Sequence, residues 1–272
     1  FGANGQVGHE LRRALAPLGE VICATRSGTL ADGTACKSAD FDVPQALAPM
    51  VAALAPDVVV NAAAYTAVDR AESEREAAFR ANALAPGELA GACARTGALL
   101  VHYSTDYVFD GRGNRPYREE DPTAPLGVYG ASKLAGEQAV AASGARHLVL
   151  RTAWVYASHG HNFMRTMLRL ARERDELRVV ADQVGTPTPA ALIADATAQV
   201  LARPFDGSGI RHLTASGETS WHGFASAIIA RAVELGLVER APKVLPISTA
   251  DYPTPAPRPA YSRLDCARLE RE

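Results

Sequence analysis

The stretch Gly2–Gly8, GANGQVG, stands at the start of the 272-residue chain and decides the fold. Its glycines have the G-x-x-G-x-x-G spacing, and the helical run Glu10–Ala16 follows them. Small residues let the backbone approach a pyrophosphate, and the free N–H groups of a helix start attract anions. A strand ending at Thr25, about 20 residues further on, completes the pattern of a dinucleotide-binding turn. Taken alone, the motif also fits a plain glycine-rich turn.

Apolar runs alternate with Ala-rich helical stretches along the first half of the chain. The runs predicted as strands are Glu20–Thr25, Asp57–Asn61, Leu99–Ser104 and His147–Val155. The predicted helices between them are Pro44–Leu54, Glu72–Thr96 with an interruption near Pro86, and Ser132–Ala142. Apolar strands alternating with helices predict a parallel sheet covered on both faces, which is the doubly wound α/β architecture of the Rossmann fold.

The alternation weakens after about Ala157, and the Pro-rich run Tyr252–Pro259 fits no helix interior or central strand. We predict an NAD(P)-binding Rossmann domain over residues 1–156, with residues 188–215 returning to it. Residues 157–187 and 216–272 are predicted to form a smaller α/β substrate-binding lobe. Because only Phe1 precedes the glycine turn, where a first strand should end, we expect a few N-terminal residues to be missing, and the run Asp265–Glu272 indicates the same for the C-terminus.

Composition excludes several kinds of partner. The formal net charge is −2 and no run of Lys or Arg occurs, so nucleic acid is not an expected partner. No apolar stretch reaches the ~18 residues that cross a bilayer, so no membrane association is expected. The four cysteines include no C-x-x-C pair, which fits free thiols in the cytoplasm. A small molecule is therefore the expected partner.

The predicted nucleotide site extends along three strand ends. Thr25 is followed by Arg26 instead of the acid that binds ribose hydroxyls in NAD sites, so Arg26 could pair with a 2′-phosphate and favour NADPH; the alternative is a solvated surface arginine. Asp40 and Phe41 could flank the adenine. The small residues Ala62–Ala64 leave room for ribose and nicotinamide, or form a tightly packed corner.

Tyr129-Gly-Ala-Ser-Lys133 is a Y-x-x-x-K motif at the start of a helix. Residues four apart lie on one helix face, so the phenol and the ammonium should point the same way. Hydride transfer to a ketone needs a proton on the oxygen, and an adjacent ammonium should lower a tyrosine pKa from near ~10. Thr105 ends a predicted strand at the edge where parallel sheets bind ligands, so it could donate to the same oxygen. An exposed Tyr and Lys at a helix start is the alternative.

The chain resembles the extended short-chain dehydrogenase/reductases, and among them the dTDP-4-dehydrorhamnose reductase family. The resemblance covers essentially the whole chain. Its segments are Gly2–Gly8, Val60–Glu72 (VNAAAYTAVDRAE), His102–Gly111 (HYSTDYVFDG), Tyr129–Glu137 (YGASKLAGE), Arg151–Ala157 (RTAWVYA), Asn162–Ala171 (NFMRTMLRLA), Asp182–Thr188 (DQVGTPT) and Tyr252–Leu264 (YPTPAPRPAYSRL).

The resemblance implies reduction of the C4 ketone of dTDP-4-dehydro-L-rhamnose to dTDP-L-rhamnose by NADPH or NADH, for cell-surface polysaccharides such as lipopolysaccharide O-antigen. It implies the catalytic residues Thr105, Tyr129 and Lys133. Together with the strand-end analysis, it gives as cofactor contacts Gly2, Gly5, Gln6, Val7, Gly8, Arg26, Asp40, Phe41, Ala62, Ala63, Ala64, Tyr65, Tyr129 and Lys133. It gives as sugar contacts Val68, Thr105, Asp106, Tyr107, Tyr129 and Trp154.

Asp106 is followed by Tyr107, whereas the related sugar-nucleotide dehydratases have Asp-Glu after the threonine. The missing glutamate argues against dehydration and for simple reduction. Two alternatives remain: a reductase for another nucleotide 4-ketosugar, and a non-catalytic, nucleotide-binding regulatory subunit.

The resemblance also extends to Mg²⁺-dependent homodimers, whose metal involves the position of Glu10 and carboxylates of a C-terminal helix. That helix is absent from the sequence, so no metal ligand set is assigned. His159 and His161 form an H-x-H pair without an evident third ligand, and we expect them to lie in a solvated loop.

Overall fold

A parallel sheet with strand order β10-β5-β4-β3 forms the centre of the molecule. The computed structural model describes residues 1–203 and 208–272; residues 204–207, inside the predicted returning segment 188–215, lie outside the described residues. The four strands are β3 (Val58–Asn61), β4 (Leu99–Thr105), β5 (His147–Thr152) and β10 (Gly209–His212). Three of them match strands predicted above, with ends that differ by up to three residues, and the fourth, β10, lies within the predicted returning segment 188–215.

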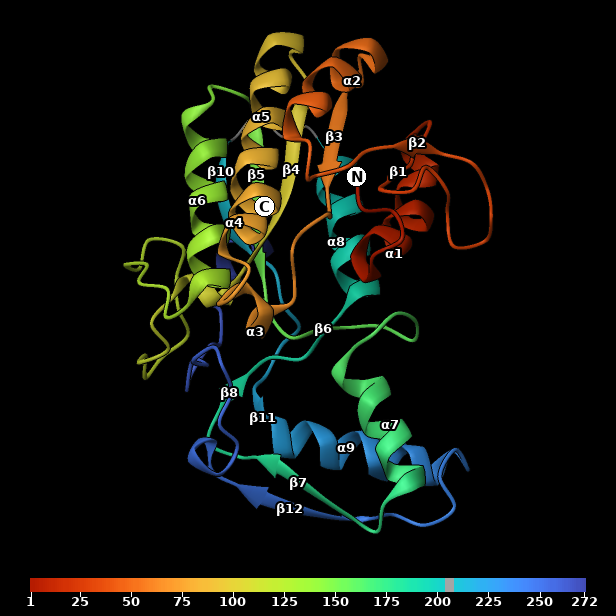
Figure 1. Cartoon of the computed structure of the whole chain (residues 1–272), viewed down its shortest axis with the longest axis vertical. Coiled ribbons are helices and arrows are strands. Elements are labelled where there is room, and N and C mark those ends of the chain that lie inside the picture. Colours follow the sequence, from red (N-terminus) through yellow and green to blue (C-terminus); the bar gives the residue numbers. More distant parts are fainter. Residues whose placement is uncertain (204–207) are drawn as a thin grey trace.

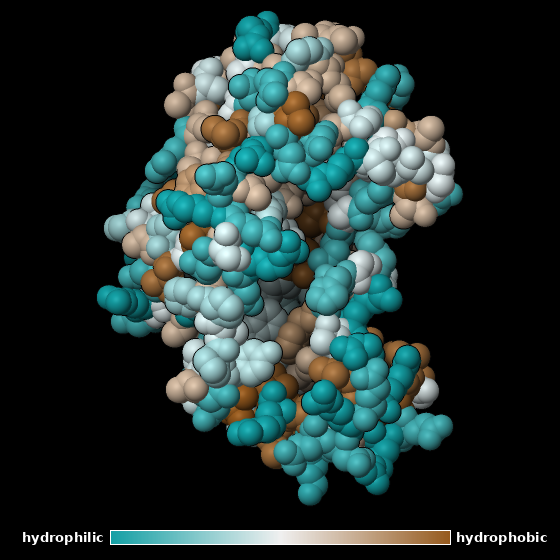
Figure 2. Space-filling view, viewed as in Figure 1, coloured by the Kyte–Doolittle hydropathy of each residue, from teal (hydrophilic) through white to brown (hydrophobic). Residues whose placement is uncertain are grey.

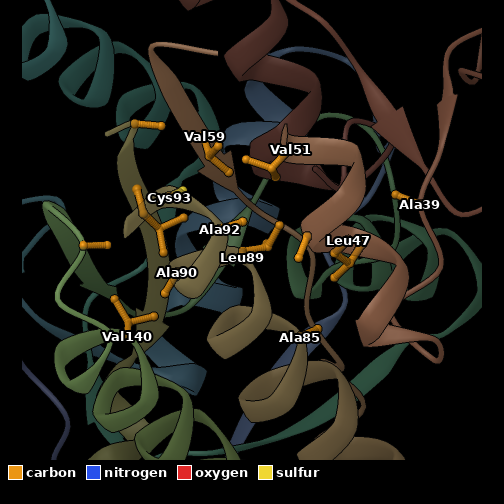
Figure 3. Close-up of a cluster of buried hydrophobic side chains, with 14 of the residues drawn as sticks. Ala39, Leu47, Val51, Val59, Ala85, Leu89, Ala90, Ala92, Cys93 and Val140 are labelled. Carbon is orange, nitrogen blue, oxygen red and sulfur yellow. The ribbon is translucent and has the colours of Figure 1, made fainter. Parts of the chain in front are cut away.

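Helices cover both faces of this sheet (Figure 1). The helices on one face are α2 (Leu47–Leu54), α5 (Ala85–Thr96) and α6 (Val128–Ala142), and those on the other are α1 (Gln6–Leu15) and α8 (Ala190–Leu201). Within β4, Leu100 belongs to the buried cluster of the first face and Val101 to that of the second, as the alternation of a strand requires. Figure 3 shows the first cluster, which includes Leu47 and Leu89. The predicted doubly wound α/β fold is confirmed.

The first residues of the chain lie between β3 and a short strand, β1 (Ala24–Thr25), which pairs in parallel with β2 (Lys37–Ser38). The Phe1 amino group donates to the Val60 carbonyl at 2.8 Å, and the Gly2 N–H donates to the Ala24 carbonyl at 3.0 Å. The predicted strand Glu20–Thr25 is thus shorter than expected, and only its last two residues pair.

The predicted helix Glu72–Thr96 consists of several pieces. They are α4 (Arg75–Phe79), a π-helical turn (Arg80–Leu84) and α5, preceded by the short α3 (Val68–Ala71). Pro86 lies in the first turn of α5, where its missing N–H leaves no hydrogen bond unmade. The interruption therefore precedes the proline and takes the form of the π-helical turn.

A second group of elements lies below the sheet in Figure 1. It contains α7 (Phe163–Glu173), α9 (Trp221–Glu234) and the parallel pair β7 (Glu176–Val180) and β12 (Lys243–Ile247). These share a buried cluster that includes Met167, Leu177 and Ile229. Short strands lie between the two parts: β6 (Val155–Tyr156), β8 (Val184–Gly185), β9 (Thr188–Pro189) and β11 (Thr219–Ser220). Near the C-terminus, α10 (Ala267–Glu270) packs on the sheet part, where Leu269 contacts the buried cluster that includes Leu11.

Two elements of the C-terminal half, α8 and β10, pack with the central sheet. Ile193 and Ala194 of α8, and Leu213 after β10, belong to the same buried cluster as Leu11 of α1. The division into residues 1–156 with 188–215, against 157–187 with 216–272, stays a prediction. Within residues 1–203 and 208–272, no helix combines the length and apolarity needed to cross a bilayer.

Candidate active site

The glycine turn packs directly against the end of β3. Gly2 has φ +80°, and a Cβ there would lie 2.6 Å from the Ala63 nitrogen. A Cβ on Gly8 would lie 2.1 Å from the Gly2 carbonyl oxygen. Gly5 is the N-cap of α1 and offers no side-chain cap, so the N–H groups at the helix start are available to an anion. Side chains at Gly2 or Gly8 would clash with neighbouring backbone and open this turn. The close-packed turn and the free N–H groups of the helix start together suit a diphosphate.

The Ala62–Ala64 segment is held by two buried asparagines. The Ala63 N–H donates to Asn61 Oδ1 at 3.1 Å. Asn82, from the π-helical turn, accepts from the Tyr65 N–H at 2.8 Å and donates to the Tyr65 carbonyl at 3.0 Å and to Ser132 Oγ of α6 at 3.0 Å. Sequence reasoning missed Asn82; the available signal was a single amide within an Ala-rich run. Asn82 connects the predicted nicotinamide corner to the helix that carries Tyr129.

Arg26 and Asp40 come together, but they pair with each other. Arg26 Nε lies 3.0 Å from Asp40 Oδ1, and its Nη2 lies 2.5 Å from Asp42 Oδ2. The Arg26 side chain is 68% exposed, so an added anion has access to it. Phe41 is buried in the core cluster and packs against Phe1, with ring centroids 6.0 Å apart.

Thr105 and Tyr129 meet at the carboxyl end of β4. Thr105 is buried, and its hydroxyl donates to Asp106 Oδ1 at 3.0 Å and accepts from the Tyr107 N–H at 3.2 Å. Burial raises the pKa of Tyr129 to about 12, and the neighbouring Thr105 hydroxyl opposes part of this rise. The expected lowering of the Tyr129 pKa is therefore wrong for this structure, which holds the phenol in its protonated form.

The pKa of Tyr129 is not lowered as expected because the Lys133 ammonium binds a backbone carbonyl instead of lying against the phenol. Lys133 is buried, and its Nζ donates to the Tyr103 carbonyl at 2.6 Å. Burial lowers the pKa of Lys133 to about 8, and Glu137 opposes the shift. Although Tyr129 and Lys133 share a helix face as predicted, Lys133 is not among the groups that shift the Tyr129 pKa.

A buried histidine, also missed from the sequence, lies beside Lys133. Since Asn61 Oδ1 accepts from the Ala63 N–H, its Nδ2 donates to His102 Nδ1, 3.1 Å away. His102 then carries its proton on Nε2, which lies 3.4 Å from Lys133 Nζ. Burial and Lys133 keep the pKa of His102 well below its usual value, so the ring is neutral. An N–H directed at the ammonium adds to the cost of charging Lys133.

Helix α6 starts earlier than predicted, at Val128 instead of Ser132, so Tyr129 lies in its first turn. Its N-cap, Gly127, has no side chain to cap the helix. Glu72 supplies the cap from outside: its Oε1 accepts from the Val128 N–H at 2.8 Å. A carboxylate at a helix start also interacts favourably with the helix dipole.

Three of the predicted sugar contacts, Asp106, Tyr107 and Val68, lie after the end of β4 and at the start of α3. Figure 2 shows a hollow between the upper and lower parts of the molecule. Asp106 is buried, and burial raises its pKa to about 6, a rise that the neighbouring Ser262 and Thr105 hydroxyls oppose in part. Its Oδ2 has no hydrogen bond of normal geometry among the described residues. The Tyr107 ring stands edge-on to Tyr129, with centroids 5.6 Å apart. Val68 begins α3 and is half-buried.

Trp154 follows β5 in a strained backbone conformation, with φ +46°. Its ring stacks on Trp221 of α9, with centroids 3.5 Å apart and planes within 3°. Gly185 also packs on the indole, since a Cβ there would lie 2.6 Å from Trp154 Cε2 and Nε1, so protein holds the ring in place. A positive φ at a bulky residue costs free energy and often marks a functional position.

Glu10, the position related to Mg²⁺ in similar proteins, has imidazole neighbours. His9, Glu10 and His159 place one ligand atom each within 4.8 Å of one another. Mg²⁺ prefers an all-oxygen shell, so this donor set does not fit it. His159 and His161 lie in a loop between β6 and α7, as expected; His161 is exposed, whereas His159 packs against His9 of α1.

A family model described as RmlD substrate binding domain matches residues 1–272. The chain belongs to this family. Proteins named dTDP-4-dehydrorhamnose reductase are 53% identical in Burkholderia thailandensis and 48% in Escherichia coli K12, over 99% and 100% of this chain and 90% of each relative.

A solved structure of another member has the same fold. The Bacillus anthracis dTDP-4-dehydrorhamnose reductase, crystallised in complex with NADP, superposes with a TM-score of 0.88 at 36% identity, over 99% of this chain and 90% of that one. This RmlD family member is therefore an oxidoreductase of Rossmann type, and the predicted resemblance is confirmed.

Proposed function

We propose that this protein reduces the C4 ketone of dTDP-4-dehydro-L-rhamnose to dTDP-L-rhamnose, with hydride from NADPH and a proton from Tyr129. The observation that carries the proposal is the meeting of Thr105 and Tyr129 at the carboxyl end of β4, where parallel sheets bind ligands. The relatives' name and the NADP in the Bacillus anthracis structure support the substrate and the cofactor.

Tyr129 is suited to donate the proton. With a pKa of about 12 its phenol is protonated throughout the physiological range. As hydride arrives, negative charge grows on the ketone oxygen, and a hydrogen-bond donor in place stabilises that charge. Thr105 offers a second donor to the same oxygen once it releases Asp106. A general acid in position contributes typically ~10²–10⁴ in rate.

The cofactor is assigned to the opposite wall of the site. Bound NADPH supplies the hydride. The glycine turn and the start of α1 would hold its diphosphate, Ala62–Ala64 would leave room for ribose and nicotinamide, and Arg26 would meet the 2′-phosphate. Lys133, now on the Tyr103 carbonyl, would hold the nicotinamide ribose with the remaining ammonium protons.

The sugar is assigned to Asp106, Tyr107, Val68 and Trp154. The buried carboxyl of Asp106, with one oxygen in no hydrogen bond of normal geometry among the described residues, would accept from a sugar hydroxyl. The site lacks a glutamate after Asp106, so it supplies no second acid for dehydration. We assign the product to the cytoplasmic supply of dTDP-L-rhamnose for cell-surface polysaccharides.

The test is an assay with NADPH and dTDP-4-dehydro-L-rhamnose, followed by loss of NADPH absorbance and by the C4 configuration of the product. We expect stoichiometric oxidation of NADPH and the L-rhamnose configuration. Oxidation only with another nucleotide 4-ketosugar would reassign the substrate. NADPH binding without reduction of either sugar would show a regulatory subunit and overturn the proposal.

A further inference from the structure

The two tryptophans of the chain stack on each other although they belong to different parts of the molecule. Trp154 follows β5 of the central sheet, and Trp221 is the first residue of α9 in the second group of elements. Their ring centroids are 3.5 Å apart and their planes differ by 3°. The ring of Trp221 therefore covers one face of the indole that is predicted to contact the sugar.

Trp154 lies close in the chain to the carboxyl end of the sheet where the reaction is assigned. Thr105 of β4 pairs in register with Thr152 of β5, two residues before Trp154. Trp154 then takes a left-handed backbone conformation, with φ +46°, which costs free energy at a bulky residue. Contacts of the ring must offset that cost, so the orientation of the indole depends on what packs against it.

One strand pair brings two such contacts to the ring of Trp154. Gly185 of β8 lies against the indole atoms Cε2 and Nε1, and it pairs with Thr219 of β11. Because β11 leads directly into α9, the same pair of strands also brings Trp221 to the face of the ring. The lower part of the molecule thus determines how the indole of Trp154 lies.

Trp221 is itself fixed within the second group of elements. Ser220 caps α9, since its Oγ accepts from the Gly223 N–H at 3.0 Å. Phe163 of α7 packs on the Trp221 ring, with centroids 4.7 Å apart, and Trp221 borders the buried cluster that includes Ile229. These contacts anchor Trp221 independently of Trp154, so it can hold the neighbouring indole in one orientation.

We propose that Trp221 is a positioning residue for the reduction and holds the Trp154 indole in the orientation that receives the ketosugar. The inference rests on the proposed function, which assigns Trp154 to the sugar. A ring that is already held loses little freedom when the sugar binds, whereas a mobile ring must be ordered at a cost in affinity. Because Trp154 is assigned to binding and not to proton or hydride transfer, the effect should fall on the KM for the sugar and not on kcat.

The test compares Trp221→Ala with Trp221→Phe in steady-state reduction of dTDP-4-dehydro-L-rhamnose. We expect Trp221→Ala to raise the KM for the sugar at least about fivefold, with kcat and the KM for NADPH changed less than about twofold. Trp221→Phe keeps an aromatic ring over the indole and should restore most of the affinity for the sugar.

Phe224→Leu is the matched control, because it removes a ring from the same helix whose aromatic partners are Phe163 and Tyr156. Its KM for the sugar should equal that of the unaltered chain. A KM unchanged in Trp221→Ala, or raised as much in Phe224→Leu, would overturn the proposal. Thermal unfolding of each variant confirms that all are assayed well below their melting temperatures.

Fluorescence provides a readout that needs no turnover. Trp154 is the one tryptophan left in either Trp221 variant, so its emission anisotropy reports the nanosecond motion of this ring. We expect a lower anisotropy in Trp221→Ala than in Trp221→Phe, and equal values would overturn the proposal. If the unaltered chain does not reduce the sugar, the proposed function fails, and the anisotropy still decides whether Trp221 holds Trp154.

Discussion

At the residue scale, Arg26 faces two kinds of partner. Its guanidinium now pairs with Asp40 and Asp42, and a 2′-phosphate would have to compete with both carboxylates. Because exposed ion pairs are weak and a bidentate phosphate contact is stronger, the phosphate should win. We predict that Arg26→Ala weakens NADPH binding at least about tenfold, or ~1.4 kcal/mol, and changes NADH binding little. Fluorescence titration with both cofactors measures this.

Asp42→Asn is the complementary variant. It removes one competing charge while leaving Arg26 in place, so NADPH should bind more tightly and NADH unchanged. If Arg26→Ala weakens both cofactors equally, Arg26 does not meet the 2′-phosphate.

Asp106 should make stability depend on pH. Its pKa is raised from 3.8 to about 6, so its favourable contribution is complete below pH 3.8 and is lost as the pH rises through about 6. We predict that Asp106→Asn is more stable than the unaltered chain at pH 7.5 by about 1–3 kcal/mol, with the difference vanishing near pH 4. Urea unfolding at both pH values measures it. A variant no more stable at pH 7.5 would show that the carboxylate is not strained by burial.

At the element scale, α6 depends on a cap supplied from another helix region. Glu72 Oε1 accepts from the Val128 N–H at the start of the helix that carries Tyr129. We predict that Glu72→Ala destabilises the protein by about 0.5–2 kcal/mol in urea unfolding and lowers turnover. Glu72→Gln keeps the acceptor and should retain most of both. Equal losses in the two variants would assign the effect to charge instead of the cap.

Elements determined by nearby residues could be predicted from the sequence, whereas those that depend on distant residues could not. The strand Leu99–Thr105 and the helix Ala190–Leu201 follow from apolar pattern and propensity, which act within a few residues. The early start of α6 depends on Glu72, far away in sequence. β1 is short because only two of its residues pair with β2, and no local sequence pattern encodes where a partner strand lies.

At the scale of the whole molecule, the site could likewise be predicted only as far as local motifs determine it. Motifs indicated Tyr129, Lys133 and Thr105, because catalytic chemistry requires those residue types at those spacings. They gave no sign that Lys133 binds the Tyr103 carbonyl, or that Asn82 joins the β3 end to α6. These contacts arise only when the sheet, the π-helical turn and α6 are packed together, so the direction of the Tyr129 pKa shift could not be derived from spacing.

At the scale of the whole molecule, the resemblance also implies that two chains associate. We predict a homodimer, which sedimentation velocity of the purified protein would detect as a species of about twice 28.7 kDa. A single species at the monomer mass at micromolar concentration would contradict the predicted homodimer.

The most direct test of the account is single-turnover reduction of dTDP-4-dehydro-L-rhamnose by Tyr129→Phe with saturating NADPH. The phenyl ring keeps the packing against Tyr107 and loses only the hydroxyl group. We predict a hydride-transfer rate lower by about 10²–10⁴ in a variant that still binds NADPH. An unaltered rate in a variant that binds NADPH normally would contradict the claim that Tyr129 protonates the ketone.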